Sequence, residues 1–534
     1  MDIDLERRVT LLLVVFALVV AGLLPLVGML GKSVFVDGKW TFAVYGKLFA
    51  NPWQYWASFE HSLALATLTT GSALVLGVPL GLLLGKTDLP GRRALTVLLC
   101  VPLLLPPYIL AVCWFNLLSG NEWLVSVMPP QIAASLSGWL FELPGCLWVL
   151  VTAFMPVVMV LTLVYLHAVN PRHEEAGRLI AGWPVVLSNV TLPMILPGIL
   201  FAGILAFLLA MGEVGVPMFL RYSVFPVETL TQFSAFYDFG AAAAAATPLL
   251  AVTLLLLALE RRYLRDKTYK LLPTTPGRRI LLIPLGRWRV PAALALTLLA
   301  ATTVVLPLFG LVVSSLSPFA YAEALSRAAE SLKRSVIFAS GGATLLAVFG
   351  FFCGYLIHHR ALQLWRAVDT LTLLLFTLPG TVVGVGLIVL WNRPGTGWLY
   401  ASAAMVILAY VAQYTALTSR IMVATLGNVP RSLEEAAQMT GAHWHARIWH
   451  VVVPAALPGL ITAWLIGFIF CLRDLGASML VYPAGQDTLP VRIFTLMANG
   501  APSLISALCV ILVAVTLVSF AALGLLFRAA SSYR

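Results

Sequence analysis

"EEAAQMTGAHWHARIWHVVVPAALPG" occupies residues 434–459, and "EEAGRLIAGWPVVLSNVTLPMILPG" at residues 174–198 is a second version of it. Both segments are acidic at the start, amphipathic in the middle and rich in proline at the end. They stand out in a chain of 534 residues that is 60% apolar and 10% charged. A polar segment that occurs twice in such a chain indicates internal duplication, and this decides how the rest of the sequence is divided.

Apolar runs of about 20 residues surround the two segments, and this is the length that a helix needs to cross a bilayer. The mean hydropathy is +0.96. The sequence therefore predicts an all-α polytopic membrane protein with about 12 transmembrane helices. The runs lie at residues 10–30, 61–85, 94–118, 144–166, 196–220 and 240–259, and then at 291–316, 335–357, 370–391, 400–418, 456–480 and 501–527.

Corresponding residues recur at nearly constant spacing in the two halves. Ser62 corresponds to Ser335, and we also paired Thr229 with Thr488. The landmarks predict a first permease unit at 1–259, a basic cytoplasmic linker at 260–290 and a second unit at 291–534. Because each unit has an even number of spans, the two units form a parallel repeat, and a substrate path is expected on the axis between them.

The charge distribution predicts the orientation. The net charge is +11, and most of the 33 Lys and Arg lie on one set of loops, which the positive-inside rule assigns to the cytoplasm together with both termini. This explains the charge without a nucleic-acid partner. Both repeated segments then lie in the cytoplasm, each between the fourth and fifth spans of its unit. The six Cys lie in or beside apolar runs and have no metal-ligand or disulfide-framework spacing.

Helical spacing predicts an apolar face on the second segment that could dock on a membrane surface or a partner. Its members are Ala436, Met439, Trp444, Ile448 and Val451. Beyond this face, the segment carries Glu-Ala-Ala, then Gly441, and later two spaced aliphatic residues followed by Pro454. This pattern resembles the EAA loop in the permease subunits of ATP-binding-cassette importers. The first segment follows it with Ala181 at the glycine position and Gly182 beside it.

The resemblance extends over essentially the whole chain, which is similar to the fused two-unit permeases of ferric-iron and thiamine importers. It implies a bacterial inner membrane protein whose two loops form coupling helices docked on two copies of a cytoplasmic ATPase. It also implies a solute-binding protein outside the membrane and no cofactor in this chain, since ATP and Mg belong to the partners. The residues expected to couple are Glu174, Glu175, Ala176, Gly182 and Pro193 in the first loop, and Glu434, Glu435, Ala436, Gly441 and Pro454 in the second.

Within these loops, Glu175 and Glu435 are the expected polar anchors toward the ATPase, and Gly441 is expected to permit a close helix approach. No nucleotide site is expected in the chain itself. "GMLGKS" (28–33) and "GLLLGKT" (81–87) resemble a phosphate loop, but Leu26 and Leu80 stand where its first glycine is required. Gly77, Gly81 and Gly85 instead predict a flat helix-packing face.

Three ionisable residues fall in the fifth apolar runs: Glu213 in the first half, and Arg473 and Asp474 in the second. Such groups are costly in hydrocarbon, so we expect them to face a translocation pathway. The alternative is that Arg473 pairs with an acid merely to hold two helices together. Prolines at 106, 107 and 379 with Gly380 break the third spans, either as gates or as simple kinks. No metal site is expected, and the His residues of the second loop are assigned to surface roles.

The sequence thus favours a permease subunit of an ATP-driven importer, with no catalytic residues and no enzymatic activity of its own. Ferric iron is the first choice of substrate, followed by thiamine and by other small solutes such as phosphonates. An ion-coupled secondary transporter is the alternative class, because twelve helices and an internal repeat are also typical of it. A membrane-embedded enzyme has no supporting constellation of carboxylates, histidines or nucleophiles.

Overall fold

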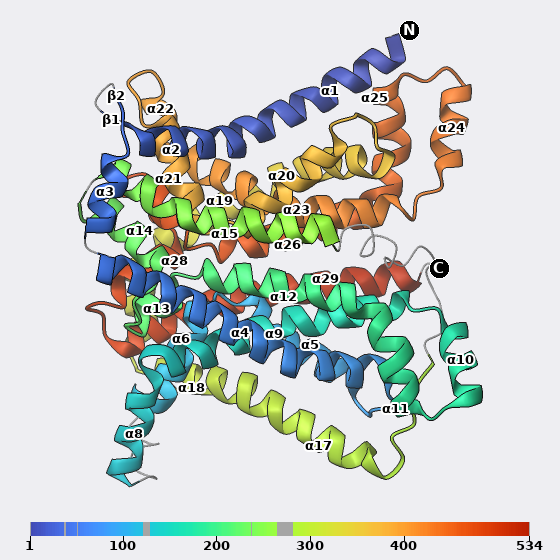
Figure 1. Ribbon diagram of the computed structural model, residues 1–534, viewed down its shortest axis with the longest axis horizontal. Coiled ribbons are helices and arrows are strands. Elements are labelled where there is room, and N and C mark those ends of the chain that lie inside the picture. The colour runs from blue at the N-terminus through green and yellow to red at the C-terminus, as the bar shows by residue number, and fades with distance from the viewer. Residues whose placement is uncertain are drawn as a thin grey trace.

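The computed structural model describes residues 2–36, 39–50, 52–120, 129–236, 238–263 and 281–532 (Figure 1). These residues are mostly helical, and their paired strands, β1 (Phe35–Val36) and β2 (Lys39–Trp40), form one short antiparallel hairpin. The predicted all-α class is confirmed. Residues 264–280, which make up most of the predicted linker, lie outside the described part of the chain.

The helices follow the predicted duplication in their order and lengths. The first half contains α1 (Asp2–Leu18), α2 (Leu24–Val34), α3 (Ala43–Ala50), α4 (Pro52–Lys86), α5 (Arg92–Leu104), α6 (Pro107–Phe115), α8 (Pro130–Leu140), α9 (Glu142–Ala168), α10 (Pro171–Ile180), α11 (Trp183–Val186), α12 (Leu192–Met211), α13 (Gly215–Phe219), α14 (Phe225–Ser234) and α15 (Phe239–Tyr263). The second half contains α17 (Arg289–Ala300), α18 (Leu306–Ser315), α19 (Ala320–His359), α20 (Trp365–Thr377), α21 (Gly380–Trp391), α22 (Gly397–Tyr400), α23 (Ala404–Leu426), α24 (Arg431–Met439), α25 (Trp444–Arg447), α26 (Val453–Leu472), α27 (Ser478–Val481), α28 (Leu489–Leu496) and α29 (Pro502–Ser532).

Ten helical stretches in the described residues are long and apolar enough to cross a membrane, and two bent pairs bring the number to as many as twelve. The bent pairs are the third spans. The chain turns by 99° between α5 and the helix that follows it, and by 108° between α20 and α21. Pro106 and Pro379 stand at these turns in extended conformation, directly before α6 and α21. The prolines therefore produce sharp breaks in both halves.

The fifth spans differ from the prediction at both ends. The predicted spans, 196–220 and 456–480, begin just after Pro193 and Pro454. Instead, helix runs without a break over Trp183–Met211 and Trp444–Leu472. A π-helical turn precedes each proline, at Leu187–Thr191 and at Ile448–Val452. A π-turn shifts the hydrogen-bond register, so the missing proline N–H does not end the helix.

The first span of each half packs against the opposite half. The stretch formed by α1 and α2 lies along α19, α20, α21 and α23, while α17 and α18 lie beside α5 and α6 (Figure 1). Close contacts mark both interfaces. Gly22 faces the side chain of Leu375, and Gly310 faces that of Leu117. The spans are thus exchanged in part between the two units, since α2 also contacts α15 and α18 also contacts α29 of their own halves. The repeat alone did not indicate this exchange.

Glycines on the second span let it approach the fourth span closely in both halves. A methyl group on Gly77 would lie 2.8 Å from Cβ of Val158, and one on Gly354 would lie 2.6 Å from Cβ of Met422. Gly81 and Gly85 likewise face side chains of α9. The predicted helix-packing face at Gly77, Gly81 and Gly85 is therefore confirmed.

A pair of buried serines confirms the repeat and corrects its register. Ser62 Oγ accepts a hydrogen bond from the Phe225 amide at 2.7 Å, and Ser335 Oγ accepts one from the Leu489 amide at 2.6 Å. Phe225 and Leu489 are the first residues of α14 and α28, so these positions correspond. Our pairing of Thr229 with Thr488 was wrong, because Thr229 lies inside α14 whereas Thr488 precedes α28.

Candidate coupling loops and central cavity

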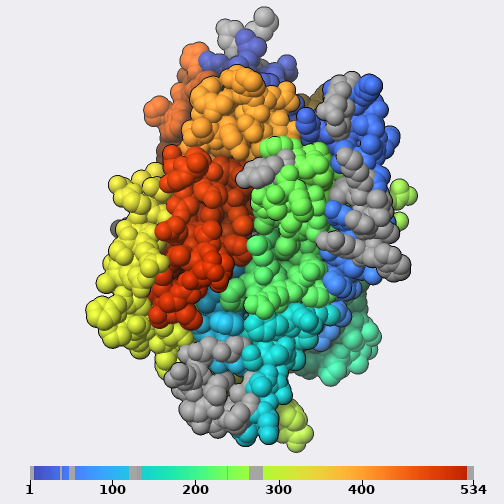
Figure 2. Space-filling model, turned by 90° about the vertical axis from the view of Figure 1, so that its left-hand side faces the viewer, coloured from blue at the N-terminus to red at the C-terminus, as the bar shows by residue number. Residues whose placement is uncertain are grey.

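The two repeated segments protrude at the same end of the helical bundle. This is also the end at which both chain termini lie (Figure 1). In the first loop α10 is followed by α11, and in the second loop α24 is followed by α25. The opposite end carries α14 and α28. In the view of that end, the green segment that includes α14 and the orange-red segment that includes α28 meet at the centre (Figure 2).

A buried ion pair holds the first loop to its own half. Glu174 is 1% exposed and pairs with Lys86 at the end of α4, which is 2% exposed. The second carboxylate oxygen of Glu174 accepts a hydrogen bond from Thr191 Oγ1 at 2.7 Å. Lys86 also donates to the carbonyl of Leu281 at 3.4 Å, so the chain that follows the undescribed linker residues meets the same point. Lys86, part of the apparent phosphate loop, is therefore a structural anchor.

Hydrogen bonds from neutral donors, without an ion pair, hold the second loop at the equivalent place. The Tyr355 hydroxyl on α19 donates to Glu434 Oε1 at 2.8 Å, and Trp444 Nε1 donates to the same hydroxyl at 3.3 Å. Trp444 is completely buried. Glu174 and Glu434 thus both face inward, and each holds its loop against the second span of its own half.

The remaining predicted coupling residues face outward. Exposed residues in the two loops are Glu175, Ala176, Gly182 and Pro193, and Glu435, Ala436, Gly441 and Pro454. Two long apolar side chains at equivalent positions accompany them: Leu179 is 89% exposed and Met439 is 88% exposed. The predicted single apolar face was wrong. The chain turns after α24, so Met439 points to solvent while Trp444 and Ile448 enter the core.

Gly441 is required by the backbone and not by a close neighbour within the chain. Its φ is +80°, and an added methyl group would meet nothing within 4 Å. The amide of Ala442 donates to the carbonyl of Ala437, and the amide of Gly441 donates to the carbonyl of Gln438. This is the Schellman pattern that ends a helix, and it favours glycine in the left-handed conformation. The close approach that we expected at Gly441 does not occur within this chain.

The N-terminal helix also contacts the second loop. Glu6 Oε2 lies 3.2 Å from Nδ1 of His445, and the Thr10 hydroxyl lies 3.2 Å from Nε2 of the same ring. His443 lies 3.9 Å from Glu6. These histidines therefore contact side chains of α1. The described residues contain no group of three or more His, Cys, Asp or Glu that could hold a metal ion.

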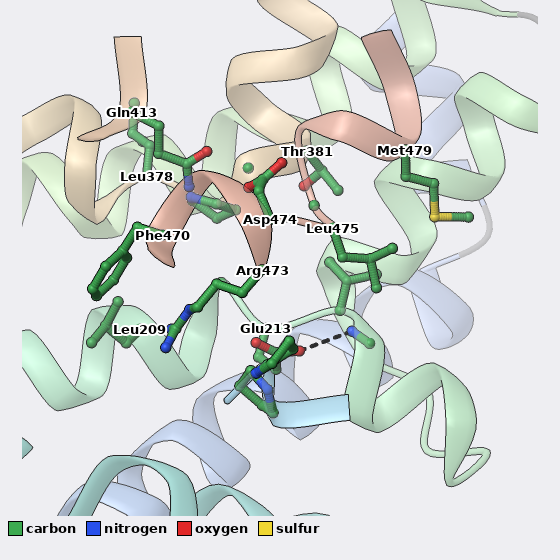
Figure 3. A pocket seen from close by; sticks show the side chains of 18 of the residues that line it. Leu209, Glu213, Leu378, Thr381, Gln413, Phe470, Arg473, Asp474, Leu475 and Met479 are labelled. Carbon is green, nitrogen blue, oxygen red and sulfur yellow. Dashed lines mark hydrogen bonds between the residues drawn. The ribbon is translucent and has the colours of Figure 1, made fainter. Parts of the chain in front are cut away.

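The three intramembrane ionisable residues meet at one cavity of about 120 Å³ between the halves (Figure 3). The first half contributes residues from α6, α12 and the turn before α13, and the second half contributes residues from α20, α21, α23 and the turn before α27. Glu213 and Asp474 do not interrupt a span. They follow the ends of α12 and α26, where their carboxylates accept backbone N–H groups from the first residues of the next short helices.

Asp474 is fully engaged by its own half. One carboxylate oxygen accepts from the Tyr414 hydroxyl at 2.7 Å, and the other accepts from the amide and the hydroxyl of Ser478 at 2.8 and 2.7 Å. Ser478 also bonds to the hydroxyl of Tyr410 at 3.1 Å. This network fixes the turn between α26 and α27, since hydrogen bonds to a charged group are strong in a buried setting.

Arg473 and Glu213 have fewer partners. Arg473 donates to the backbone carbonyl of Leu103 in α5, so it crosses between the halves, and its guanidinium lies 4.5 Å from the centre of the Phe470 ring. Within the described residues, no ion pair shorter than 4.0 Å joins Arg473 to an acid. The geometry therefore does not support the alternative in which Arg473 pairs with an acid to hold two helices together. Glu213 accepts the amide of Gly215 at 3.1 Å, and it also accepts from the backbone of Val216.

Several residues of these sites were not predicted from the sequence. Lys86, Tyr355 and Thr191 hold the loops, and Tyr410, Tyr414 and Ser478 hold Asp474. Of these residues, only Lys86 could have been noticed in the sequence. It is a charged residue at the end of an apolar run, in a segment that resembles a phosphate loop but lacks its first glycine. The others are single polar residues within helices, and they reach their partners only through the fold.

Comparisons with known proteins agree with this architecture. Residues 346–531 match the family described as "Binding-protein-dependent transport system inner membrane component". The chain is 22% identical over 421 residues to a ferric transport system permease protein of Actinobacillus pleuropneumoniae, a match that covers 75% of this chain and 61% of that protein. A putative ferric transport system permease of Haemophilus influenzae is 23% identical over 415 residues, with 74% and 65% covered.

A shorter match is to a permease that is named for a different substrate. A putative 2-aminoethylphosphonate transport system permease of Salmonella typhimurium is 31% identical over 145 residues, which are 26% of this chain and 52% of that protein. The chain thus spans somewhat less than two thirds of the length of the first two relatives, and about half of the third. The predicted resemblance to a fused permease of the ferric type is supported by the longest of these matches.

Proposed function

We propose, from the membership of residues 346–531 in the inner membrane component family of binding-protein-dependent transport systems, that the whole chain is the permease of an ATP-driven importer. In this proposal the two units 1–259 and 291–534 enclose the translocation path. A solute-binding protein delivers cargo at the end that carries α14 and α28, and two ATPase subunits dock at the other end. Both termini are then cytoplasmic.

The observation that carries the proposal is the pair of equivalent loops at one end of the bundle. Each loop is fixed to its second span by an inward glutamate and presents an outward glutamate, Glu175 or Glu435, beside a nearly fully exposed apolar side chain. Large apolar side chains exposed beside polar groups are typical of protein interaction sites. A rigid attachment is what a motor subunit needs in order to move the membrane helices, and the internal anchors supply it.

Co-purification with the ATPase tests this proposal. We expect the double variant Leu179→Asp/Met439→Asp to lose the ATPase subunits and ATP-dependent uptake while still entering the membrane, because charges replace the apolar contacts at both loops. The matched control is Trp398→Asp on α22 at the opposite end, where the side chain is 76% exposed. That variant should retain the ATPase. Retention of the ATPase by the loop variant would contradict the coupling role.

Ferric iron is the proposed cargo, supported by the two ferric transport permeases that match over about three quarters of this chain. Thiamine was the other cargo that the resemblance suggested. A phosphonate is the second candidate, supported by the shorter but more identical match. An ion-coupled transporter would take up its solute without nucleotide. Uptake into proteoliposomes with and without enclosed ATP, with iron or a phosphonate supplied on the binding protein, separates these alternatives.

A further inference from the structure

The central cavity contains polar atoms that the chain itself leaves without partners. Tyr108 and Thr381 are each 1% exposed, and both line the cavity. In the part of the chain that the structure describes, neither hydroxyl has a hydrogen-bond partner, and the same is true of Gln413 Oε1. Buried polar atoms nearly always find a partner, so three orphaned oxygens around one cavity, from α6, α21 and α23, indicate a ligand from outside the chain.

The two acids of the cavity are equivalent by repeat but not by environment. Corresponding positions of α9 and α23 are 260 residues apart, since Gly81 packs on Thr162 and Gly354 packs on Met422. Tyr414, which bonds to Asp474, therefore corresponds to Phe154, and Tyr410 corresponds to Leu150. Without these hydroxyls, Glu213 is bound by backbone N–H groups of Gly215 and Val216, whereas Asp474 also accepts from the side-chain hydroxyls of Tyr414 and Ser478.

The charge balance of the cavity favours a cation. Two carboxylates and one guanidinium line it, so its formal charge is negative. The guanidinium of Arg473 is already held by the Leu103 carbonyl and the Phe470 ring, and in the close-up it extends toward Leu209 and Phe470 (Figure 3). The buried cavity atoms without a partner in the described chain, on Tyr108, Thr381 and Gln413, are all oxygens, and the carboxylate of Glu213 adds two more. Oxygen donors without nitrogen or sulfur suit hard metal ions, and they also accept from ammonium groups.

We propose that this cavity is a transient binding site for a compact cation in transit, with Glu213 as its charged ligand and Tyr108, Thr381 and Gln413 as its neutral oxygen donors. The inference rests on the proposed transport function. The volume of about 120 Å³ limits the ligand. An apolar cavity of ~150 Å³ accommodates benzene, so a partly hydrated metal ion or a short amine fits here and a larger cargo such as thiamine does not.

Equilibrium binding to the full chain, assembled with its ATPase in lipid nanodiscs, tests the site directly. The probes are Ga³⁺ supplied as its citrate complex, a four-carbon diamine, inorganic phosphate, and citrate alone. We expect saturable binding of one of the two cations and none of phosphate or citrate. Binding of Ga³⁺ assigns a hard metal ion, and binding of the diamine assigns an ammonium ligand. Saturable binding of phosphate in place of both cations would overturn the proposal.

Variants locate the binding in the cavity. Glu213→Gln, which preserves shape, should weaken cation binding at least tenfold, and Tyr108→Phe and Thr381→Val should each weaken it several-fold. The control is Glu330→Gln, which removes an exposed carboxylate on α19 and should change nothing. Equal affinity of wild type and Glu213→Gln would overturn the site. ATPase co-purification is measured on the same samples, so a chain that binds the ATPase but no cation refutes this site without refuting the importer.

Discussion

Lys86 and Glu174 form a charge pair that is almost wholly removed from solvent. Removing one partner of such a pair leaves a buried charge, which costs about 3–5 kcal/mol. We therefore expect Lys86→Met to destabilise the first half strongly, as measured by thermal unfolding of the purified chain. The double variant Lys86→Met/Glu174→Leu should recover most of the loss, because a buried ion pair replaced by apolar side chains is often neutral.

Tyr355→Phe in the second half is the matched comparison for this pair. It removes one neutral donor to Glu434, which is worth about 1–3 kcal/mol when the acceptor is charged. The effect should be smaller than that of Lys86→Met, because Glu434 is only partly buried and water can replace the hydroxyl. If Lys86→Met and Tyr355→Phe lower the unfolding temperature equally, the ion pair does not anchor the first loop as described.

Gly441 supplies a second residue-scale prediction. Its φ of +80° costs a residue with a side chain about 1–2 kcal/mol. Gly441→Ala should therefore loosen the last turn of α24, seen as roughly tenfold faster hydrogen exchange at its final amides. Gly182→Ala in the first loop is the control, because its φ is −71° and only a Pro184 carbon at 3.7 Å is near. Similar exchange in both variants would mean that the left-handed cap is unimportant.

The sequence located the two repeated loops but not the orientation of their glutamates. Glu174 and Glu175 are neighbours with the same chemistry, and the pattern expected both to be coupling residues. Only the fold brings Lys86, 88 residues away, to one of them. Gly441 was likewise singled out from the sequence, and its left-handed backbone is a requirement that the sequence did not indicate. The predicted close approach of a partner helix stays a prediction.

At the scale of helices, the bent third spans depend on backbone contact. A methyl group on Gly380 would lie 2.7 Å from the backbone nitrogen of Ala477 and 3.0 Å from the carbonyl carbon of Gly476. Backbone cannot move aside as a flexible side chain can. We expect Gly380→Ala to cost about 1–3 kcal/mol, the usual range for overpacking, in thermal unfolding. Gly395→Ala, near the exit of the same span and with nothing within 4 Å, should cost little.

A null result for Gly380→Ala would show that α21 does not pack against the turn after Asp474, and the cavity wall would then need revision. The sequence predicted the presence of this break from Pro379 and Gly380 but could not choose between a gate and a simple kink, and it did not indicate the sharp turn. Proline removes a hydrogen bond in either case. The angle of 108° is set by what the next helix packs against, and that information is spread over both halves.

The π-turns show a case, also at the scale of helices, in which the sequence suggested a helix boundary that the structure does not have. Proline at 193 and 454 suggested helix boundaries, yet the helix continues through both. The equivalent arrangement recurs in the first spans, where π-turns at Val19–Leu23 and Ala301–Val305 precede Pro25 and Pro307. Hydropathy located the other spans but not all their ends, since the helix predicted to begin at residue 335 begins at Ala320. It extended the fifth spans past Met211 and Leu472 because apolar residues continue after the helix has ended.

At the scale of the whole molecule, duplication predicted two equal units, whereas the fold exchanges their first spans. Hydropathy and spacing describe each half separately, so they do not predict which half a span packs against. The exchange means that neither unit buries its own core alone. Separating the halves would expose the side chain of Leu375, which packs on Gly22. It would likewise expose the side chain of Leu117, which packs on Gly310.

Expression of the chain as two pieces, 1–263 and 281–534, tests this consequence. Each piece alone should insert into the membrane but be degraded or aggregate on extraction, because the first span of each piece exposes the face that the other half covers. Co-expression should restore a complex that co-purifies, since the exchanged spans lock the halves together without the linker. Two pieces that are each stable and monomeric alone would show that the first spans pack on their own halves, and the arrangement of the cavity between the units would then be wrong as well.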